Sequence, residues 1–292
     1  MASDRERNDR RGRKGGFAPN PQGARSGTGF SGPGSGAGAS GPRRHGPPRE
    51  DASFWIWGWH AVEAAVLNPD RPAPERLLAT ADRAKALAAL RPGLKLDVVE
   101  PVEIARRLPQ GASHQGVALR TPPLDGASLE EIAAAGAGVI LVLDQVTDPQ
   151  NVGAILRSAA AFGARGVVMQ DRHAPPLGGA LAKAAAGALE RTPVARVVNL
   201  SRALETLADA GWTSVGLDGR AQTPLAEALA VPAVVIVLGS EGEGLRRLVA
   251  EHCDILAAIP MPGGFESLNV ASAAAIALYA AAGRSGPRPT GE

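Results

Sequence analysis

A polar loop that leads into a helix is the first place where residue types and spacing suggest chemistry. It runs from Asp144 to Gly153, and the helical pattern after it carries Arg157. Backbone N–H groups at a helix N-terminus can receive an anion such as a phosphate, and a permanently charged arginine would strengthen that site. The structural alternative is that Asn151 caps the helix and Arg157 pairs with a carboxylate.

A second loop, Leu238–Leu245, contains three glycines in six residues. Glycines allow positive φ and let the backbone approach a ligand closely. Glu241 and Glu243 would repel a pyrophosphate, so a nucleoside that carries a positive charge, such as S-adenosylmethionine, is the better guest. A NAD-dependent oxidoreductase would instead need an N-terminal glycine fingerprint, which the sequence lacks. The structural alternative is a flexible turn with solvated acids.

A third polar segment, Ile259–Ser272, leads into a helix of small residues. Ser267 is a natural N-cap, and Asn269 falls in the first turn. The alanine run that follows would let another backbone pack very close. Taken alone, this segment is equally well explained as a capped, alanine-rich helix.

Short apolar runs and helical patterns alternate around these loops. Several of the runs lack polar alternation, as do strands that are buried on both faces of a parallel sheet. The pattern predicts an α/β domain with a mostly parallel sheet, in which ligands bind at the carboxyl ends of the strands. The predicted strands are Val139–Leu143, Gly166–Met169, Val194–Val197, Thr213–Leu217, Val234–Leu238 and Ile255–Ile259. The predicted helices are Val152–Phe162, Gly179–Ala186, Ser201–Ala210 and Ser267–Ala282, with Gly163 and Gly211 at C-caps.

A smaller α/β unit is predicted over residues 53–121, joined by a linker over 122–137 to the larger domain at 138–283. The linker should contain a short helix, Leu129–Ala135. The smaller unit's predicted elements are helices Trp59–Leu67, Asp82–Leu90 with Asp82 as its N-cap, and Pro101–Leu108, and strands Arg76–Ala79, Lys95–Val99 and Val117–Arg120.

Composition and charge distinguish the ends from the centre. Residues 1–52 and 284–292 are rich in Gly, Pro and Arg, which predicts disorder. Ten basic residues oppose four acidic ones over 1–50, whereas 21 oppose 25 in the remainder. The basic tail is either an electrostatic tether for RNA or only a solubilising segment. The N-terminus lacks the apolar core of a secretory signal, and Leu268–Ala282 reads as a buried helix, not a membrane span.

The single cysteine, Cys253, rules out an internal disulfide and a thiolate metal cluster. A chain with a single cysteine is compatible with the reducing environment of the cytoplasm. No metal-ligand cluster is visible, so no metal is expected.

Taken together, the three polar segments resemble the signature motifs of the SpoU/TrmH family in the SPOUT class of RNA methyltransferases. The matched stretches are Asp148–Ala159, Gly239–Leu245, and Ile259–Met261 with Ser267–Ala271. The resemblance covers about residues 137–283. Gly187–Glu190 before Pro193–Val194 also fits a linking segment of the family. The stretch Pro262–Glu266 departs from the pattern at the cofactor lip.

The resemblance implies a C-terminal trefoil knot, a homodimer, and a cleft for S-adenosylmethionine between the second and third loops. The cofactor-binding residues implied by the motif match are Gly239, Ile259, Leu268, Leu238, Gly244 and Met261.

The catalytic residues implied by the same match begin with Arg157. Because arginine stays protonated, we expect it to bind the phosphate beside the target ribose and to stabilise the developing alkoxide, not to act as a simple base. Asn151 would orient Arg157 or the ribose. Glu241, Ser267 and Asn269 would supply the remaining hydrogen bonds.

The segments Gly58–Ala65 and His114–Val117 resemble the N-terminal, L30-like RNA-binding domain of the large-subunit rRNA guanosine 2′-O-methyltransferases. His114 can equally be a turn residue before a strand. The resemblance implies 2′-O-methylation of a guanosine ribose in the P-site loop of 23S-type rRNA. The alternatives are a tRNA ribose methyltransferase of the same family and a non-catalytic RNA-binding ribosome-assembly factor.

Overall fold

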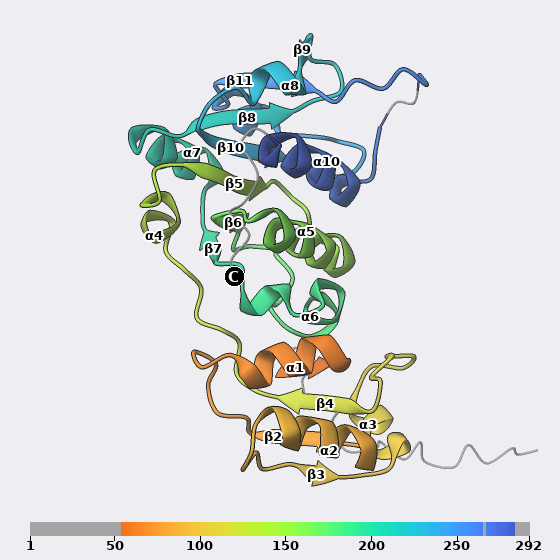
Figure 1. Ribbon diagram of the computed structural model, residues 1–292. Helices are drawn as coiled ribbons and strands as arrows, with labels where there is room; N and C mark the ends of the chain where they lie inside the picture. The colour runs from red at the N-terminus through yellow and green to blue at the C-terminus, as the bar shows by residue number, and fades with distance from the viewer. Residues whose placement is uncertain (1–53, 265–266, 284–292) are drawn as a thin grey trace, which may run out of the picture. The chain divides into compact units, whose positions relative to one another are not determined.

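The computed structural model describes residues 54–264 and 267–283, which form two β-sheets with their covering helices (Figure 1). The predicted tails, 1–52 and 284–292, lie outside the described residues, as do Phe265 and Glu266 of the stretch Pro262–Glu266.

The first sheet has four strands in the order β1-β4-β2-β3. β4 lies antiparallel to both β1 and β2, and β3 pairs parallel with β2. The elements of this part are β1 (Trp55–Trp57), α1 (Trp59–Leu67), β2 (Arg76–Ala79), α2 (Ala81–Leu90), β3 (Asp97–Val98), α3 (Pro101–Arg107) and β4 (Val117–Arg120).

Two expectations for this part were wrong in detail, and one strand was missed. The N-cap of α2 is Thr80, so Asp82 lies inside the first turn, where its charge still suits the helix dipole. β3 keeps only two exposed residues of the predicted strand because it pairs with a single neighbour at the sheet edge. β1 was not predicted: Trp55–Trp57 is too short to show a period.

The second sheet has seven strands in the order β7-β6-β5-β10-β8-β11-β9, and all its pairings are parallel. This confirms the α/β fold with a parallel sheet. Its elements are α4 (Leu129–Ala133), β5 (Gly138–Leu143), α5 (Pro149–Phe162), β6 (Gly166–Gln170), α6 (Gly179–Ala185), η2 (Ala188–Glu190), β7 (Val194–Val197), α7 (Leu200–Asp209), β8 (Thr213–Leu217), β9 (Thr223–Pro224), α8 (Leu225–Ala228), β10 (Ala233–Leu238), α9 (Arg247–Glu251), β11 (Ile255–Ala258) and α10 (Val270–Ala282).

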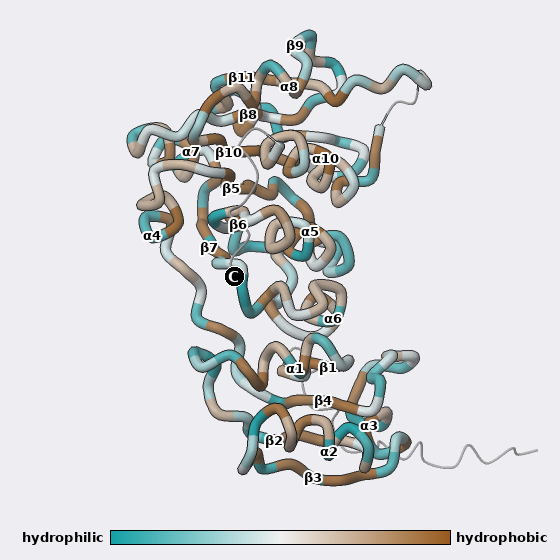
Figure 2. The backbone as a smooth tube through the Cα atoms, in the orientation of Figure 1, coloured by the Kyte–Doolittle hydropathy of each residue, from teal (hydrophilic) through white to brown (hydrophobic). Residues whose placement is uncertain are grey.

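Helices cover both faces of this sheet, which explains its apolar strands (Figure 2). Every residue of β10 is buried. Along β5, Leu141 and Leu143 face the core under α5, α6 and α10, whereas Ile140 and Val142 face the core under α4, α7 and α9. The alternate side chains therefore enter two different hydrophobic cores.

The helices at the predicted loops begin at other residues than expected. α5 begins at Pro149, because the carboxylate of Asp148 accepts a hydrogen bond from the Gln150 N–H at 3.1 Å. The cap is thus Asp148 and not Asn151. α10 begins at Val270 with Asn269 as its N-cap, three residues later than the predicted start at Ser267. The C-cap at Gly163 is confirmed by its left-handed φ of 69°.

No helix of the described residues is long and apolar enough to cross a membrane.

Cys253 follows α9, and its thiol donates a hydrogen bond to the Val249 carbonyl at 3.3 Å. Burial, with the nearby charges of Asp254 and Asp144, raises the pKa of this thiol from 9.0 to about 12. We expect iodoacetamide at about pH 8 to leave the native thiol unmodified and to alkylate it in denaturant, because the thiolate is the nucleophile. Mass spectrometry would measure this, and alkylation of the folded protein at the unfolded rate would contradict it.

The same shift has a consequence for stability. Between pH 9.0 and about 12 the unfolded thiol ionises while the folded one keeps its proton. The contribution of this group to stability is therefore complete below pH 9.0 and is lost as the pH rises through that range.

Candidate active site

The three polar segments follow β5, β10 and β11. β10 is hydrogen bonded to β5, and β11 is separated from β10 by β8 alone. Because the strands are parallel and neighbouring strands lie about 4.8 Å apart, their carboxyl ends bring the segments to one edge of the sheet.

At this edge, Asn151, Glu241 and Asn269 form one hydrogen-bonded cluster. The Asn151 amide nitrogen donates to Glu241 Oε1 at 3.0 Å. The Asn269 amide nitrogen donates to Asn151 Oδ1 at 3.0 Å and also to Glu241 Oε1. Each residue comes from a different polar segment, and 90 and 118 residues separate Asn151 from the other two. Side chains far apart in sequence thus meet where the sequence predicted a site.

The start of α10 fixes two members of this cluster. Asn269 Oδ1 accepts hydrogen bonds from the Ala271 and Ser272 N–H groups at 2.9 and 3.3 Å. Glu241 Oε1 accepts from the Val270 N–H at 3.4 Å. A carboxylate at the positive end of a helix is electrostatically favoured, so the helix holds Glu241 toward the cluster.

Arg157 does not join this cluster. Since α5 starts at Pro149, Arg157 lies about two turns along the helix. Its side chain is exposed and makes no hydrogen bond or ion pair with the described residues. Asn151 was expected to orient either Arg157 or the ribose, and in the structure its side chain is hydrogen bonded to Glu241 and Asn269 and not to Arg157. Asp148 also places a carboxylate at the helix N-terminus, where a bound phosphate had been expected.

Ser267 likewise stands apart. It is exposed, two residues before the cap of α10, and within the described parts of the chain its hydroxyl has no hydrogen-bond partner. Its catalytic role stays a prediction.

The predicted cofactor residues line the loops after β10 and β11. Leu238 ends β10 with its side chain buried, so any contact with a ligand must come from its backbone. After β11, Ile259 and Met261 are half-buried and Leu268 is exposed. These three side chains offer apolar surface in the segment that contributes Asn269 to the cluster.

Gly239 is required by a close backbone approach. Ser240 and Gly244 exchange two backbone hydrogen bonds of 3.1 Å, which folds the loop back on itself. A Cβ on Gly239 would lie 2.1 Å from the Gly244 carbonyl carbon, and Gly244 itself has a φ of 71°. The glycines therefore close a tight backbone loop, and Gly244 has the positive φ that glycine permits.

We expect Gly239→Ala to lower the affinity for S-adenosylmethionine by about tenfold or more, because overpacking that forces backbone shifts typically costs about 1–3 kcal/mol. Isothermal titration calorimetry would measure this. Gly283→Ala is the matched control, since Gly283 has a φ of −61° at the end of α10 and a Cβ there would come no closer than 3.6 Å to another atom. Equal affinities for the two variants would contradict the prediction.

An ion pair with a buried carboxylate supports the first two polar segments, and the sequence did not predict it. The Asp144 side chain is fully buried at the end of β5 and accepts from Arg246 Nε at 2.7 Å and from its backbone N–H at 2.9 Å. Arg246 Nη2 also donates to Gln170 Oε1 at 3.1 Å. The partners are 102 residues apart, and no local pattern pairs them.

A hollow of about 340 Å³ opens beside the site, at the carboxyl ends of β5 and β6. Gln145, Arg172 and His173 line it, and none of them was predicted as a site residue. Gln145 and His173 have φ values of 57° and 70°, which non-glycine residues seldom adopt.

Among the residues that the structure describes, no group of three or more His, Cys, Asp or Glu side chains could hold a metal ion.

Comparison with known proteins shows which family the chain belongs to. Residues 138–279 match the model of the SpoU rRNA Methylase family. The 23S rRNA (guanosine-2′-O-)-methyltransferase RlmB of Xylella fastidiosa is 37% identical over 236 residues, which are 78% of this chain and 95% of that protein. The chain belongs to the SpoU family of RNA methyltransferases. All three polar segments lie within the residues that match the family model.

Two further similar proteins are named as RNA methyltransferases. A protein of Synechocystis sp. named as an uncharacterized tRNA/rRNA methyltransferase is 40% identical over 242 residues, 79% of this chain and 62% of the relative. The chain thus spans about three fifths of that relative's length. The crystal structure of an AdoMet-bound rRNA methyltransferase from Sinorhizobium meliloti aligns with a TM-score of 0.65 at 27% identity, covering 79% of this chain and 87% of that one.

Proposed function

We propose that this protein transfers a methyl group from S-adenosylmethionine to a ribose 2′-hydroxyl of RNA. The observation that carries the proposal is the Asn151–Glu241–Asn269 cluster, which joins one residue from each SpoU motif. A non-catalytic RNA-binding protein would have no need to keep these groups together at one sheet edge.

The loops fit the cofactor. The glycines of the loop after β10 carry no side chain that would keep a ligand from the backbone, and the apolar surfaces of Ile259, Met261 and Leu268 suit an adenine ring. The Glu241 carboxylate suits a positive sulfonium and would repel a pyrophosphate. When bound, S-adenosylmethionine supplies an electrophilic methyl group.

The chain's own groups must then position and activate the ribose. A 2′-hydroxyl is a weak nucleophile until its proton leaves, so catalysis needs orientation and stabilisation of the developing negative charge. Arg157, exposed and without a protein partner in the described parts of the chain, is free to bind the phosphate beside the target and to stabilise the alkoxide. Asn151 and Asn269 would hold the ribose by hydrogen bonds, and Ser267 would join them once RNA is bound.

For the substrate, we propose a guanosine in the P-site loop of large-subunit rRNA. The similarity to the Xylella RlmB over nearly all of that protein supports this choice. Residues 53–121 would serve as an L30-like RNA-binding domain, joined by the linker 122–137 to the methyltransferase domain, 138–283. A tRNA substrate is the second candidate, favoured by the tRNA/rRNA name of the Synechocystis relative. An RNA substrate also implies a cytoplasmic location.

We also propose a homodimer and a knotted chain. Phe162 of α5 and Tyr279 of α10 are exposed and pack edge to face, with exposed Ile276 on the same helix. An exposed apolar surface of this kind supports association with a second copy. The position of β10 between β5 and β8, filled only after the chain has made β8, is consistent with threading of the C-terminal segment.

The test combines tritiated S-adenosylmethionine with unmodified large-subunit rRNA or, separately, with tRNA, and maps 2′-O-methylation by protection from alkaline hydrolysis. We expect label at one guanosine in the P-site loop of the rRNA. Label on tRNA alone would overturn the rRNA proposal and support the second candidate. Bound cofactor without label on either RNA would contradict the catalytic proposal.

A further inference from the structure

A groove of about 670 Å³ lies between α1 of the first sheet and α5, α6 and η2 of the second. One wall of the groove is a face of α1, which includes His60 and Glu63. From the other side it is lined by Arg157 of α5 and by Arg191, which directly follows η2. Residues of both sheets therefore enclose one surface depression.

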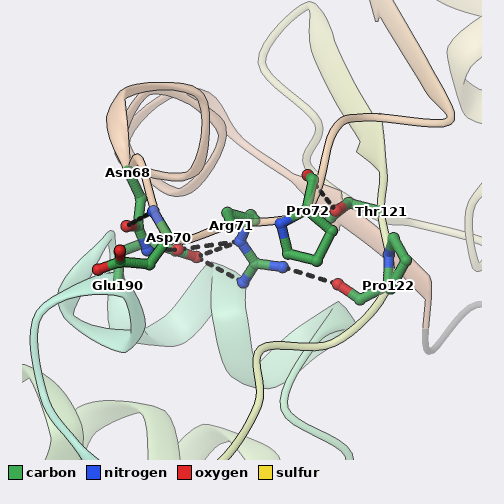
Figure 3. Close-up of polar contacts among 7 residues, drawn as sticks. All are labelled: Asn68, Asp70, Arg71, Pro72, Thr121, Pro122 and Glu190. Carbon is green, nitrogen blue, oxygen red and sulfur yellow. Dashed lines mark hydrogen bonds and ion pairs between the residues drawn. The ribbon is translucent and has the colours of Figure 1, made fainter.

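The walls of this groove are held together by a buried ion pair (Figure 3). Arg71 Nη2 donates to Glu190 Oε1 at 2.7 Å, and the two side chains are only 2% and 4% exposed. Asn68 Nδ2 donates to Glu190 Oε2 at 2.9 Å, and Arg71 Nη1 donates to the Pro122 carbonyl at 3.0 Å. Arg71 thus neutralises the Glu190 carboxylate, which also lines the groove.

Close packing and further hydrogen bonds hold α1 against the segment that contains Lys183 and Gly187. A Cβ on Gly187 would lie 2.9 Å from Ala64 Cβ and 3.0 Å from the His60 carbonyl, so α1 can approach only because residue 187 is glycine. Near the start of α1, Gln115 Oε1 accepts from the Trp59 N–H at 2.9 Å and from Lys183 Nζ at 2.7 Å. Contacts therefore hold α1, which forms one wall of the groove, at both of its ends.

The groove carries positive charge that no described residue uses. The exposed guanidinium of Arg191, like that of Arg157, makes no hydrogen bond or ion pair with the described part of the chain. With Glu190 paired to Arg71, the only other acid in the lining is Glu63, which lies 3.6 Å from His60 Nδ1. Two free guanidiniums against one partly exposed acid favour a polyanion, and arginine matches phosphate oxygens in a bidentate geometry.

We propose that this groove binds the sugar-phosphate backbone of the substrate RNA next to the methylated ribose, with Arg191 and His60 as phosphate-contacting residues from its two walls. The proposal rests on the proposed function and extends its RNA-binding surface. Arg157 connects the two sites, because it lines the groove and lies on α5 about 9 Å along the axis from Asn151 in the cluster. RNA lying in the groove would pass directly to the active edge of the sheet.

The test measures the affinity of the full chain for a transcript of the large-subunit rRNA P-site loop over a series of salt concentrations. We expect Arg191→Gln to weaken binding by about tenfold, since a charged hydrogen bond contributes about 1.5 kcal/mol or more. It should also reduce the salt slope by about 0.7 to 0.9, the value for one lost phosphate contact. His60→Gln should weaken binding in the same direction by a smaller factor.

Arg202→Gln is the matched control, because Arg202 is exposed on α7, over the opposite face of the parallel sheet. This control should bind RNA as the wild type does, and all variants should keep the wild-type affinity for S-adenosylmethionine. Wild-type RNA affinity and salt slope in Arg191→Gln would overturn the groove proposal even if the wild type methylates RNA. A weakened Arg191→Gln in a protein that methylates no RNA would support the groove and overturn only the catalytic proposal.

Discussion

Replacing Arg157 with alanine is expected to lower the rate of methyl transfer to RNA by about 100-fold or more, which is the usual cost of removing a group that stabilises developing negative charge. Arg157 has no partner among the described residues that its loss would leave unsatisfied, so the fold should be unaffected. Affinity for S-adenosylmethionine should also be unchanged, since the predicted cofactor residues lie in other loops.

Single-turnover kinetics with saturating cofactor and RNA would separate the chemical step from binding. Arg157→Lys should remain well below the wild type, because an ammonium cannot replace a planar, bidentate guanidinium. Arg202→Ala provides the control for loss of one exposed arginine. A single-turnover rate for Arg157→Ala within about twofold of the wild type would show that the transition state does not depend on this side chain.

Replacing Arg71 with methionine is expected to lower the free energy of unfolding by about 3–5 kcal/mol, because it leaves the buried carboxylate of Glu190 without its counter-ion. Urea denaturation followed by circular dichroism would measure this. Arg76→Met is the matched control: its ion pair with Asp97 has side chains 40% and 54% exposed, and such surface pairs contribute about 1 kcal/mol or less.

The double variant Arg71→Met/Glu190→Leu tests the cause of that loss. Replacing both members of a buried pair by apolar residues is often close to neutral, so the double variant should recover most of the stability. A double variant as unstable as Arg71→Met would mean that the stability comes from packing of the arginine stem and not from the paired charges.

The elements of the parallel sheet could be predicted because their signals are local. β10 is an unbroken apolar run, and Gly163 marks the end of α5. The helix boundaries that were predicted wrongly depend on which of several polar residues caps the helix. Asp148, Asn151, Ser267 and Asn269 can all cap, and only the packed structure selects Asp148 and Asn269.

The motifs allowed the loops of the candidate site to be predicted, but not the contacts between their side chains. Asn151, Glu241 and Asn269 were singled out by type and position, but their mutual hydrogen bonds follow from strand order, which periodicity does not encode. The Asp144–Arg246 and Arg71–Glu190 pairs join residues 102 and 119 positions apart, and a single sequence gives no signal for such pairs.

The chemical identity of the product tests most directly whether the protein methylates a ribose 2′-hydroxyl. RNA incubated with the wild-type protein and S-adenosylmethionine would be digested to nucleosides and analysed by mass spectrometry. We expect 2′-O-methylguanosine, with the added mass on the ribose fragment. A methyl group found on a base would contradict it, because the cluster and Arg157 would then be activating a different nucleophile.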